Sequence, residues 1–186
     1  MSTLIDDILK LSRISTRRVE RQSIALNAIA ETVLEQLRKT SPERDVNVEI
    51  HHPMVAEADP KLIRLVFENL LGNAWKYTAR NEASLIKSGS TIHGLDMDAV
   101  RVYFIQDNGV GFDMQYVEKL FQPFQRLHKE TDFEGAGIGL VSVKRIIEMH
   151  KGQVWIKSVL NQGTVVYFIL QASSKDVVSD LEPVFA

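Results

Sequence analysis

The sequence predicts an α+β fold: a two-layer sandwich with helices on one face of a mixed sheet, preceded by a short helical stub. Three observations lead to it. Helical and strand-like apolar patterns are mixed along the chain, without internal repeats. The last two expected strands are joined by Asn161-Gln162-Gly163, a good hairpin turn that implies an antiparallel pair. The 186 residues suffice for one core and a short appendage.

The N-terminal half is expected to be mainly helical. Its elements are predicted as a helix at 4–14, a short strand at 18–24, a helix at 27–39 and a strand at 46–50. A helix as short as the first is marginal in water and needs a packing partner. A third long helix begins where Asp59 can act as N-cap, with Pro60 at the first helical position.

The C-terminal half is expected to supply most of the sheet. Strands are predicted at 83–87, 99–106, 153–159 and 164–171, and helices at 115–120 and 138–150. A loop rich in Ser, Gly, His and Asp separates the first two strands. We therefore expect a stub (1–16), a domain (17–171) and a tail (172–186) that has no clear period and is loosely attached.

Composition excludes several classes of protein. The formal charge of -2 argues against a nucleic acid or an anionic membrane as an electrostatically held partner. The absence of cysteine excludes disulfides and thiolate metal sites. No apolar stretch reaches the roughly 18 to 20 residues of a membrane span, and Asp6 and Asp7 interrupt any signal peptide. We expect a cytoplasmic chain, and a membrane-anchored parent protein stays open.

The third long helix carries a polar stripe opposite its apolar one. At about 100° per residue, Asn69, Asn73 and Lys76 project from the same face. Two carboxamides and an ammonium so placed can bind a hard cation through oxygen and hold phosphate oxygens. The alternative is a solvated helix face, but asparagine is a poor helix former and two on one face need a reason.

The run from Asp107 to Gly111 directly follows an apolar strand. Its paired glycines, Gly109 and Gly111, allow a tight turn and close approach to a ligand. The carboxylate of Asp107, at the strand end, could accept a hydrogen bond from an exocyclic amine such as that of adenine. On local grounds alone an ordinary β-turn is favoured, because Asp-Asn-Gly is an excellent turn sequence.

Two further segments suit phosphate binding. The glycines of Gly135-Ala136-Gly137-Ile138-Gly139-Leu140 open a helix, where N–H groups and the helix dipole attract anions. The spacing is one residue short of a dinucleotide fingerprint and lacks a preceding strand, and there is no P-loop. Upstream, Phe121 and Phe124 could anchor a loop whose Arg126 and His128 face phosphates, although a structural role is equally favoured.

Taken in order, these segments resemble the four signature boxes of the histidine kinase ATP-binding domain, whose superfamily includes gyrase B-type topoisomerases and heat-shock chaperone ATPases. The boxes are the asparagine box (68–77), the first glycine box (107–111), the phenylalanine box (121–124) and the second glycine box (135–140). The resemblance runs from about residue 4 to 171. The residues at 75–77 and 123–128 are most similar to those of phytochrome-like kinases.

The resemblance implies a Bergerat-type ATP-binding fold with ATP and Mg²⁺ as ligands. Asp107 would accept the adenine amino group, with Gly111 and Thr164 near the base and Tyr77 flanking the nucleotide. Asn69 and Asn73 would hold Mg²⁺, and Lys76 would hold phosphates. Residues 114–134 would form a lid, with Arg126 or His128 reaching the γ-phosphate. The other residues assigned to nucleotide binding are Gly109, Phe124, Gly135, Gly137, Gly139 and Leu140.

The resemblance also bears on the reaction. ATP-hydrolysing relatives carry a water-activating glutamate where this chain has Asn69, and an amide cannot accept a proton at neutral pH. Glu68 is turned about 100° away and cannot simply replace it. Phosphoryl transfer to an external acceptor is therefore favoured over hydrolysis, which disfavours a gyrase-type ATPase.

The acceptor itself is not found in the sequence. Residues 1–14 resemble only the end of the second helix of the kinase's phosphoacceptor hairpin, and none of the five histidines lies in an acceptor motif. The implied partners are a histidine-bearing helical hairpin of the parent kinase and a response regulator, with homodimerisation through the N-terminal helix. The alternative is a regulatory module of the anti-sigma-factor serine-kinase type, which would not need the stub.

Overall fold

The computed structural model of the chain describes residue 14 and residues 17–93, 99–123, 125 and 137–171. Expectations for the stub before Ile14, for the loop at 94–98, for most of the lid and for the tail lie outside the described residues.

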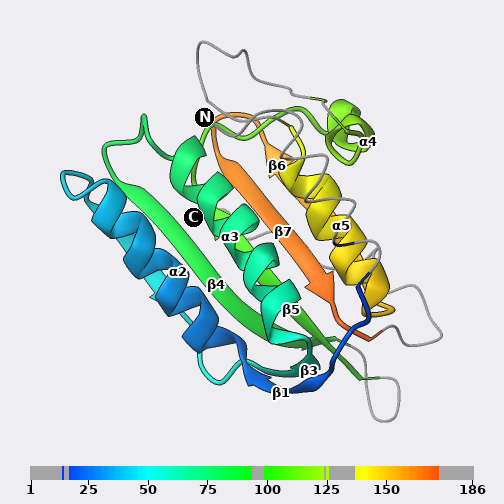
Figure 1. Cartoon of the computed structure of the whole chain (residues 1–186). Coiled ribbons are helices and arrows are strands. Elements are labelled where there is room, and N and C mark those ends of the chain that lie inside the picture. Colours follow the sequence, from blue (N-terminus) through cyan, green and yellow to red (C-terminus); the bar gives the residue numbers. More distant parts are fainter. Residues whose placement is uncertain (1–13, 15–16, 94–98, 124, 126–136, 172–186) are drawn as a thin grey trace.

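The main sheet has five strands and is mixed (Figure 1). In spatial order they are β2 (Val46–Ile50), β4 (Ser84–His93), β5 (Val100–Asp107), β7 (Gly163–Ile169) and β6 (Gln153–Val159). The pair β2 and β4 is parallel, and the other neighbours are antiparallel. A separate two-stranded sheet joins β1 (Gln22–Ala25) to β3 (Val55–Ala58).

Three long helices cover one face of this sheet, as predicted (Figure 1). They are α2 (Leu26–Thr40), α3 (Pro60–Tyr77) and α5 (Gly139–Met149). The core between the layers contains Phe67 of α3, Ile146 of α5 and Phe168 of β7, each at most 1% exposed. A 3-10 turn, η2 (Met114–Tyr116), leads into the short helix α4 (Val117–Leu120). Among the described residues, no helix has both the length and the apolarity to cross a membrane.

Two strands predicted from the sequence had wrong boundaries, and a third strand was missed. The strand expected at 18–24 is β1, four residues at 22–25, and its partner β3 was missed altogether. The strand expected to end at 87 continues to 93, through Ser88, Gly89 and Ser90. The ring of Phe104 on β5 lies over Gly89, where a Cβ would be only 2.7 Å from it. This cross-strand ring packs where the glycine has no side chain, so a sequence typical of a loop remains in the strand.

The N-terminus of α3 is anchored by a buried carboxylate. Asp59, 1% exposed, accepts hydrogen bonds from the N–H groups of Lys61 (3.0 Å) and Leu62 (3.1 Å), as an N-cap should. Its other oxygen accepts one from the N–H of Glu20 (3.1 Å) and lies 3.9 Å from the guanidinium of Arg17. One side chain thus joins the start of α3 to the segment that enters the domain.

A buried histidine, His150, connects Asp59 at the start of α3 to the end of α5. The N–H of Asp59 donates to Nε2 of His150 (3.0 Å), so Nδ1 carries the proton and donates to the carbonyl of Ile146 (2.8 Å). The guanidinium of Arg21 donates to the carbonyl of His150 (2.5 Å). His150 is 0% exposed, and this burial lowers its pKa below the ordinary value of 6.5.

We expect the free energy of unfolding to fall as the pH drops below about 6.5. The unfolded chain takes up a proton at His150 near the ordinary pKa, whereas the folded chain does so only at lower pH. The loss is up to about 1.4 kcal/mol for each pH unit between the two pKa values. Urea unfolding at a series of pH values measures it. In His150→Gln, which keeps an acceptor but cannot be protonated, an equally steep decline would contradict the assignment.

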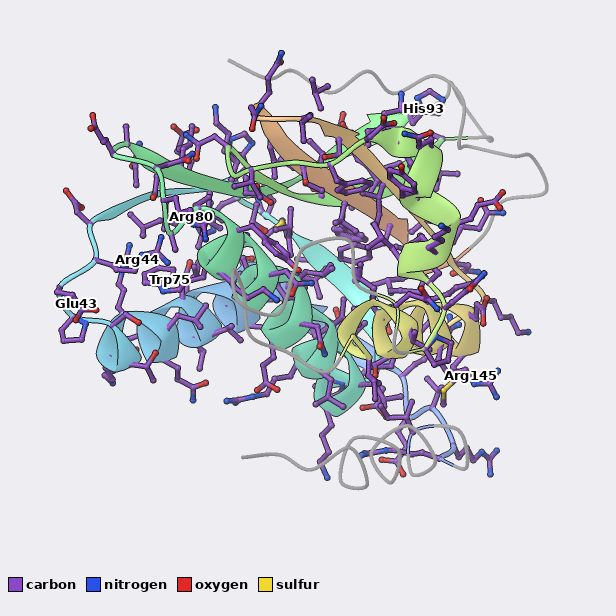
Figure 2. All side chains as sticks on the ribbon, turned by 90° about the horizontal axis from the view of Figure 1, so that it is seen from above. Glu43, Arg44, Trp75, Arg80, His93 and Arg145 are labelled. Carbon is purple, nitrogen blue, oxygen red and sulfur yellow. The ribbon has the colours of Figure 1, made fainter. Side chains whose placement is uncertain are left out.

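The C-terminus of α3 is fixed by an arginine from the turn between α2 and β2. The guanidinium of Arg44 lies 5.0 Å from the centre of the Trp75 ring and donates to the carbonyl of Trp75 and to Oγ1 of Thr78 (3.2 Å). Figure 2 shows the two labelled side chains together at one end of the helical layer. Both ends of α3 are therefore held by groups from outside the helix.

Candidate functional site

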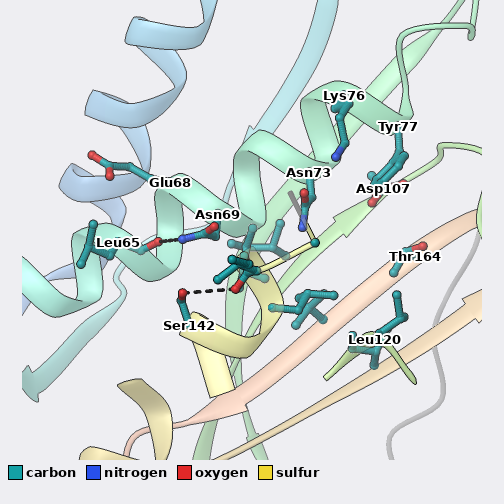
Figure 3. Close-up of a pocket in the computed structure, with 18 of the residues that line it drawn as sticks. Leu65, Glu68, Asn69, Asn73, Lys76, Tyr77, Asp107, Leu120, Ser142 and Thr164 are labelled. Carbon is teal, nitrogen blue, oxygen red and sulfur yellow. Dashed lines mark hydrogen bonds between the residues drawn. The ribbon is translucent and has the colours of Figure 1, made fainter. Parts of the chain in front are cut away.

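A cavity of about 700 Å³ lies between α3, the start of α5 and the strands β5, β6 and β7 (Figure 3). Ten of the predicted site residues line it: Asn69, Asn73, Lys76, Tyr77, Asp107, Gly111, Gly137, Gly139, Leu140 and Thr164. Gly109 is not among the lining residues. The predicted residues Phe124, Gly135, Arg126 and His128 lie outside the described part of the chain. Segments far apart in sequence thus meet around one cavity.

One end of the cavity contains a buried carboxylate. Asp107 is 7% exposed and is the last residue of β5, where it pairs with Thr164 of β7. Its Oδ1 accepts a hydrogen bond from the N–H of Gly109 (2.8 Å). Burial raises the pKa of Asp107 to about 7, against the opposing effect of hydrogen bonds from the backbone of Gly109 and Thr164. The second oxygen is suited to an uncharged ligand that donates a hydrogen bond.

Two glycines shape the backbone around Asp107. Gly111 and Gly163 have positive φ angles of 55° and 129°, which side chains other than glycine's rarely tolerate. A Cβ at position 111 would collide with the carbonyl of Val159, and one at 163 with the carbonyl of Asp107. Gly109 has a different role, since a Cβ there would lie 2.6 Å from the carbonyl of Tyr77. The glycines permit close contact between β5, β7 and the end of α3.

Asn108 is a positioning residue that sequence reasoning missed. Its Oδ1 accepts from the N–H of Leu85 (2.9 Å), and its Nδ2 donates to the carbonyl of Ala83 (2.8 Å). Its backbone carbonyl accepts from Nδ2 of Asn81, and the N–H of Val110 donates to the carbonyl of Tyr77 (3.2 Å). The turn that carries Asp107 is thus fastened to the loop after α3. Local sequence indicated only a good turn, because these partners lie more than twenty residues away.

The polar stripe of α3 lines the cavity, and its three residues lie on one face of the helix, as their spacing predicted (Figure 3). Nδ2 of Asn69 donates to the carbonyl of Leu65 (2.8 Å), so the carboxamide is oriented by its own helix and Oδ1 remains for a ligand. A Cβ on Gly139 would lie 2.6 Å from that oxygen, so Oδ1 points at the start of α5. Nζ of Lys76 lies 4.3 Å from the centre of the Tyr77 ring.

Glu68 does not take the place of Asn69. Glu68 also lines the cavity, but its carboxylate accepts a hydrogen bond from Nε of Arg64 (2.8 Å), and Figure 3 shows it directed away from Asn69. Among the described residues, no group of three or more His, Cys, Asp or Glu side chains could hold a metal ion. A cation here would be bound by amide oxygens and by oxygens of a ligand, a donor set that fits Mg²⁺.

The cavity continues beyond Asn69 into an apolar region that the sequence did not predict. Leu62 and Leu65 of α3 line it together with Ile14, which is 7% exposed and belongs to the core on the helical side of the sheet. Arg17 also lines it, near Asp59. The end of the N-terminal segment therefore forms part of the wall.

Comparison with known proteins agrees with this geometry. The profile of the family described as "Histidine kinase-, DNA gyrase B-, and HSP90-like ATPase" matches residues 58–174. The phytochrome-like protein Cph1 of Synechocystis is 34% identical over 168 residues, 90% of this chain, and the chain spans 22% of the length of that relative.

Solved structures give the same fold. The catalytic domain of histidine kinase ThkA is 25% identical, with a TM-score of 0.64 over 80% of this chain and 93% of its own. Full-length ShkA in complex with AMPPNP has a TM-score of 0.70 at 22% identity, over 94% of this chain and 36% of its own. The chain belongs to the histidine kinase-, DNA gyrase B- and HSP90-like ATPase family, with phytochrome-like proteins among its relatives.

Proposed function

We propose that this chain is the ATP-binding catalytic part of a two-component sensor histidine kinase. It transfers the γ-phosphoryl group of ATP to a histidine outside the chain, on a helical hairpin of the parent kinase, and a response regulator receives the group from there. The observation that carries the proposal is the single cavity with a buried carboxylate at one end and the carboxamide stripe of α3 at its middle. The proposed division is a stub (1–16), a catalytic domain (17–171) and a tail (172–186), acting in the cytoplasm.

The base of ATP would occupy the end of the cavity at Asp107. The exocyclic amine of adenine is neutral and donates hydrogen bonds, which suits a carboxylate that is too buried for a cationic partner to reach easily. Gly111 and Thr164 line the same end and would contact the base, and Tyr77 would flank the nucleotide. A desolvated acceptor discriminates between ligands more strongly than a solvent-exposed one. A ligand without the hydrogen-bond donor would leave the buried carboxylate unpaired.

The triphosphate would extend along α3 toward Asn69. Oδ1 of Asn69 and the carboxamide of Asn73 would bind Mg²⁺, and Lys76 with the N–H groups after Gly137 would hold phosphate oxygens. Phosphoryl transfer mainly requires positioning and charge neutralisation, which this donor set supplies. Bound Mg²⁺ would neutralise charge on the phosphates. Neither Asn69 nor the engaged Glu68 would activate a water molecule, so ATP would be kept for the acceptor histidine.

The test is transfer to a supplied acceptor. The chain is mixed with ATP, Mg²⁺ and a separately made histidine-bearing hairpin of a phytochrome-like kinase, and phosphate on the hairpin is measured. Acid-labile, base-stable phosphate is expected, and it should disappear when the acceptor histidine is replaced by glutamine. ATP binding without transfer to any histidine would reduce the proposal to a nucleotide-binding module. Transfer to a serine would favour the anti-sigma-factor type, for which the structure offers no specific observation.

A further inference from the structure

A buried serine on β6, Ser158, forms hydrogen bonds beside the Asp107 end of the cavity. It lies directly opposite Thr164 of β7 and is 6% exposed. Thr164 lines the cavity, whereas Ser158 is not among the lining residues. Oγ of Ser158 accepts a hydrogen bond from the N–H of Phe112 (2.9 Å) and donates one to the carbonyl of Gly163 (2.9 Å). A third joins it to Oγ1 of Thr164 (3.0 Å), so one hydroxyl connects three segments around the cavity.

The number of available protons determines the direction of this third hydrogen bond. A serine hydroxyl has one proton to donate and two lone pairs that accept. The proton of Ser158 is directed at the carbonyl of Gly163, which can only accept. Turning that proton toward Thr164 would leave two oxygen atoms 2.9 Å apart with no proton between them. The hydrogen bond between the two hydroxyls is therefore donated by Thr164, and it occupies the second lone pair of Ser158.

Thr164 consequently faces the cavity as a hydrogen-bond acceptor. Its single proton is used on Ser158, and its oxygen keeps two lone pairs. Asp107, its cross-strand partner on β5, is an acceptor as well when it is ionised. Figure 3 shows the labelled side chains of Asp107 and Thr164 next to one another at this end of the cavity. The two side chains together present acceptor oxygens and no donor, which matches a ligand group with two hydrogens on one atom.

We propose that Ser158 is a positioning residue for selection of the nucleotide base. By engaging the proton of Thr164, it makes the Asp107 end of the cavity accept both hydrogens of an exocyclic amine and exclude a carbonyl. The inference rests on the proposed function, in which the base of ATP occupies this end. A 6-amino purine donates one hydrogen to Asp107 and the other to Thr164. A 6-oxo purine brings a carbonyl oxygen against two acceptors and leaves all three oxygens unpaired.

Removal of the Ser158 hydroxyl would release the proton of Thr164. The Thr164 hydroxyl could then rotate and donate to a carbonyl, because a hydroxyl turns to suit its partner. The base end of the cavity would lose selectivity between amine and carbonyl. A purely structural role of Ser158, in support of Phe112 and Gly163, would instead weaken the binding of every purine nucleotide alike.

The ratio of two affinities measures this selectivity. Isothermal titration calorimetry of the full chain with Mg²⁺ compares ATP with its 6-oxo analogue inosine triphosphate (ITP), at about pH 8, where Asp107 with its pKa of about 7 is mostly ionised. In Ser158→Ala the preference for ATP over ITP should fall about 3- to 10-fold. Ser158→Thr keeps the hydroxyl and should keep the preference.

Ser84→Ala is the matched control. Ser84 is another buried strand serine, 5% exposed, whose Oγ donates to a carbonyl, that of Thr78 (2.9 Å), and it is not among the residues that line the cavity. Its replacement removes a comparable hydrogen bond from the interior. The free energy of unfolding should therefore fall, and the preference for ATP over ITP should stay that of the unchanged chain.

A second variant decides the question even if Ser158→Ala does not fold. Thr164→Val removes the acceptor itself and should weaken ATP binding about 3- to 10-fold while ITP binds as well as before or more tightly. Adding Ser158→Ala to Thr164→Val should not change the ratio further. An unchanged ratio in Ser158→Ala, or an equal loss for both nucleotides in Thr164→Val, would contradict the positioning role and leave the ATP site standing. If the unchanged chain binds neither nucleotide, the proposed function and this inference are both wrong.

Discussion

Replacing Asp107 by asparagine is expected to weaken ATP binding about 10- to 150-fold. The change removes a buried charged acceptor and leaves an amide that can present a donor to the adenine amine. A hydrogen bond to a charged group contributes about 1.5 to 3 kcal/mol, and 1.4 kcal/mol corresponds to a factor of ten in affinity. Isothermal titration calorimetry with a non-hydrolysable ATP analogue measures the dissociation constant directly.

The pH dependence of ATP binding distinguishes loss of the Asp107 carboxylate from general damage to the fold. Because the pKa of Asp107 is about 7 and the carboxylate is the better acceptor, the affinity of the unchanged chain should rise as the pH is raised through 7. The Asp107→Asn variant should lose that rise. Asp45→Asn, the same change at an exposed position, should keep both the affinity and the pH profile. A retained pH profile in Asp107→Asn would contradict the assignment.

The second large effect is expected from Gly163→Ala, which should lower the free energy of unfolding by about 3 kcal/mol or more. The φ angle of 129° at Gly163 is strained for alanine, and such strain costs about 1 to 3 kcal/mol. The new Cβ would in addition collide with the carbonyl of Asp107 and lie 2.8 Å from Cα of Asn108. Urea unfolding followed by circular dichroism measures the loss.

Gly72→Ala is the matched control for this change. Gly72 lies inside α3, where a Cβ would have no neighbour within 4 Å. Alanine there should stabilise the domain by about 0.5 to 1 kcal/mol, because glycine is a poor helix former. Equal effects of the two substitutions would mean that backbone conformation at Gly163 does not limit stability.

Each part of the cavity has a local sequence pattern, but only the resemblance to the kinase boxes predicted that the parts form one site. Helical spacing alone puts Asn69, Asn73 and Lys76 on one face, and the cap at Asp59 determines where that helix begins. The turn after β5 was found from its glycines. The helices and the antiparallel final hairpin follow from apolar periodicity, so the fold class was also predictable.

The parts that were missed depend on contacts between distant segments. The strand β3 has four residues and exists because it pairs with β1. The extension of β4 past Ser88 depends on a ring contributed by β5. The bridging role of Asn108 requires the loop after α3 to lie beside the turn. None of these contacts has a local signal in composition or period.

The carboxylate of Asp59 has a thermodynamic consequence. It serves at once as the cap of α3 and as the acceptor for the entering chain at Glu20, so the two are coupled through one group. Linkage is reciprocal, because a ligand that favours one arrangement of α3 favours the matching arrangement of the entering segment by the same free energy. Occupancy of the cavity and the arrangement of the segment from Arg17 to Glu20 would then depend on one equilibrium. A change at Glu20 would then alter the affinity of a ligand in the cavity, although Glu20 does not line it.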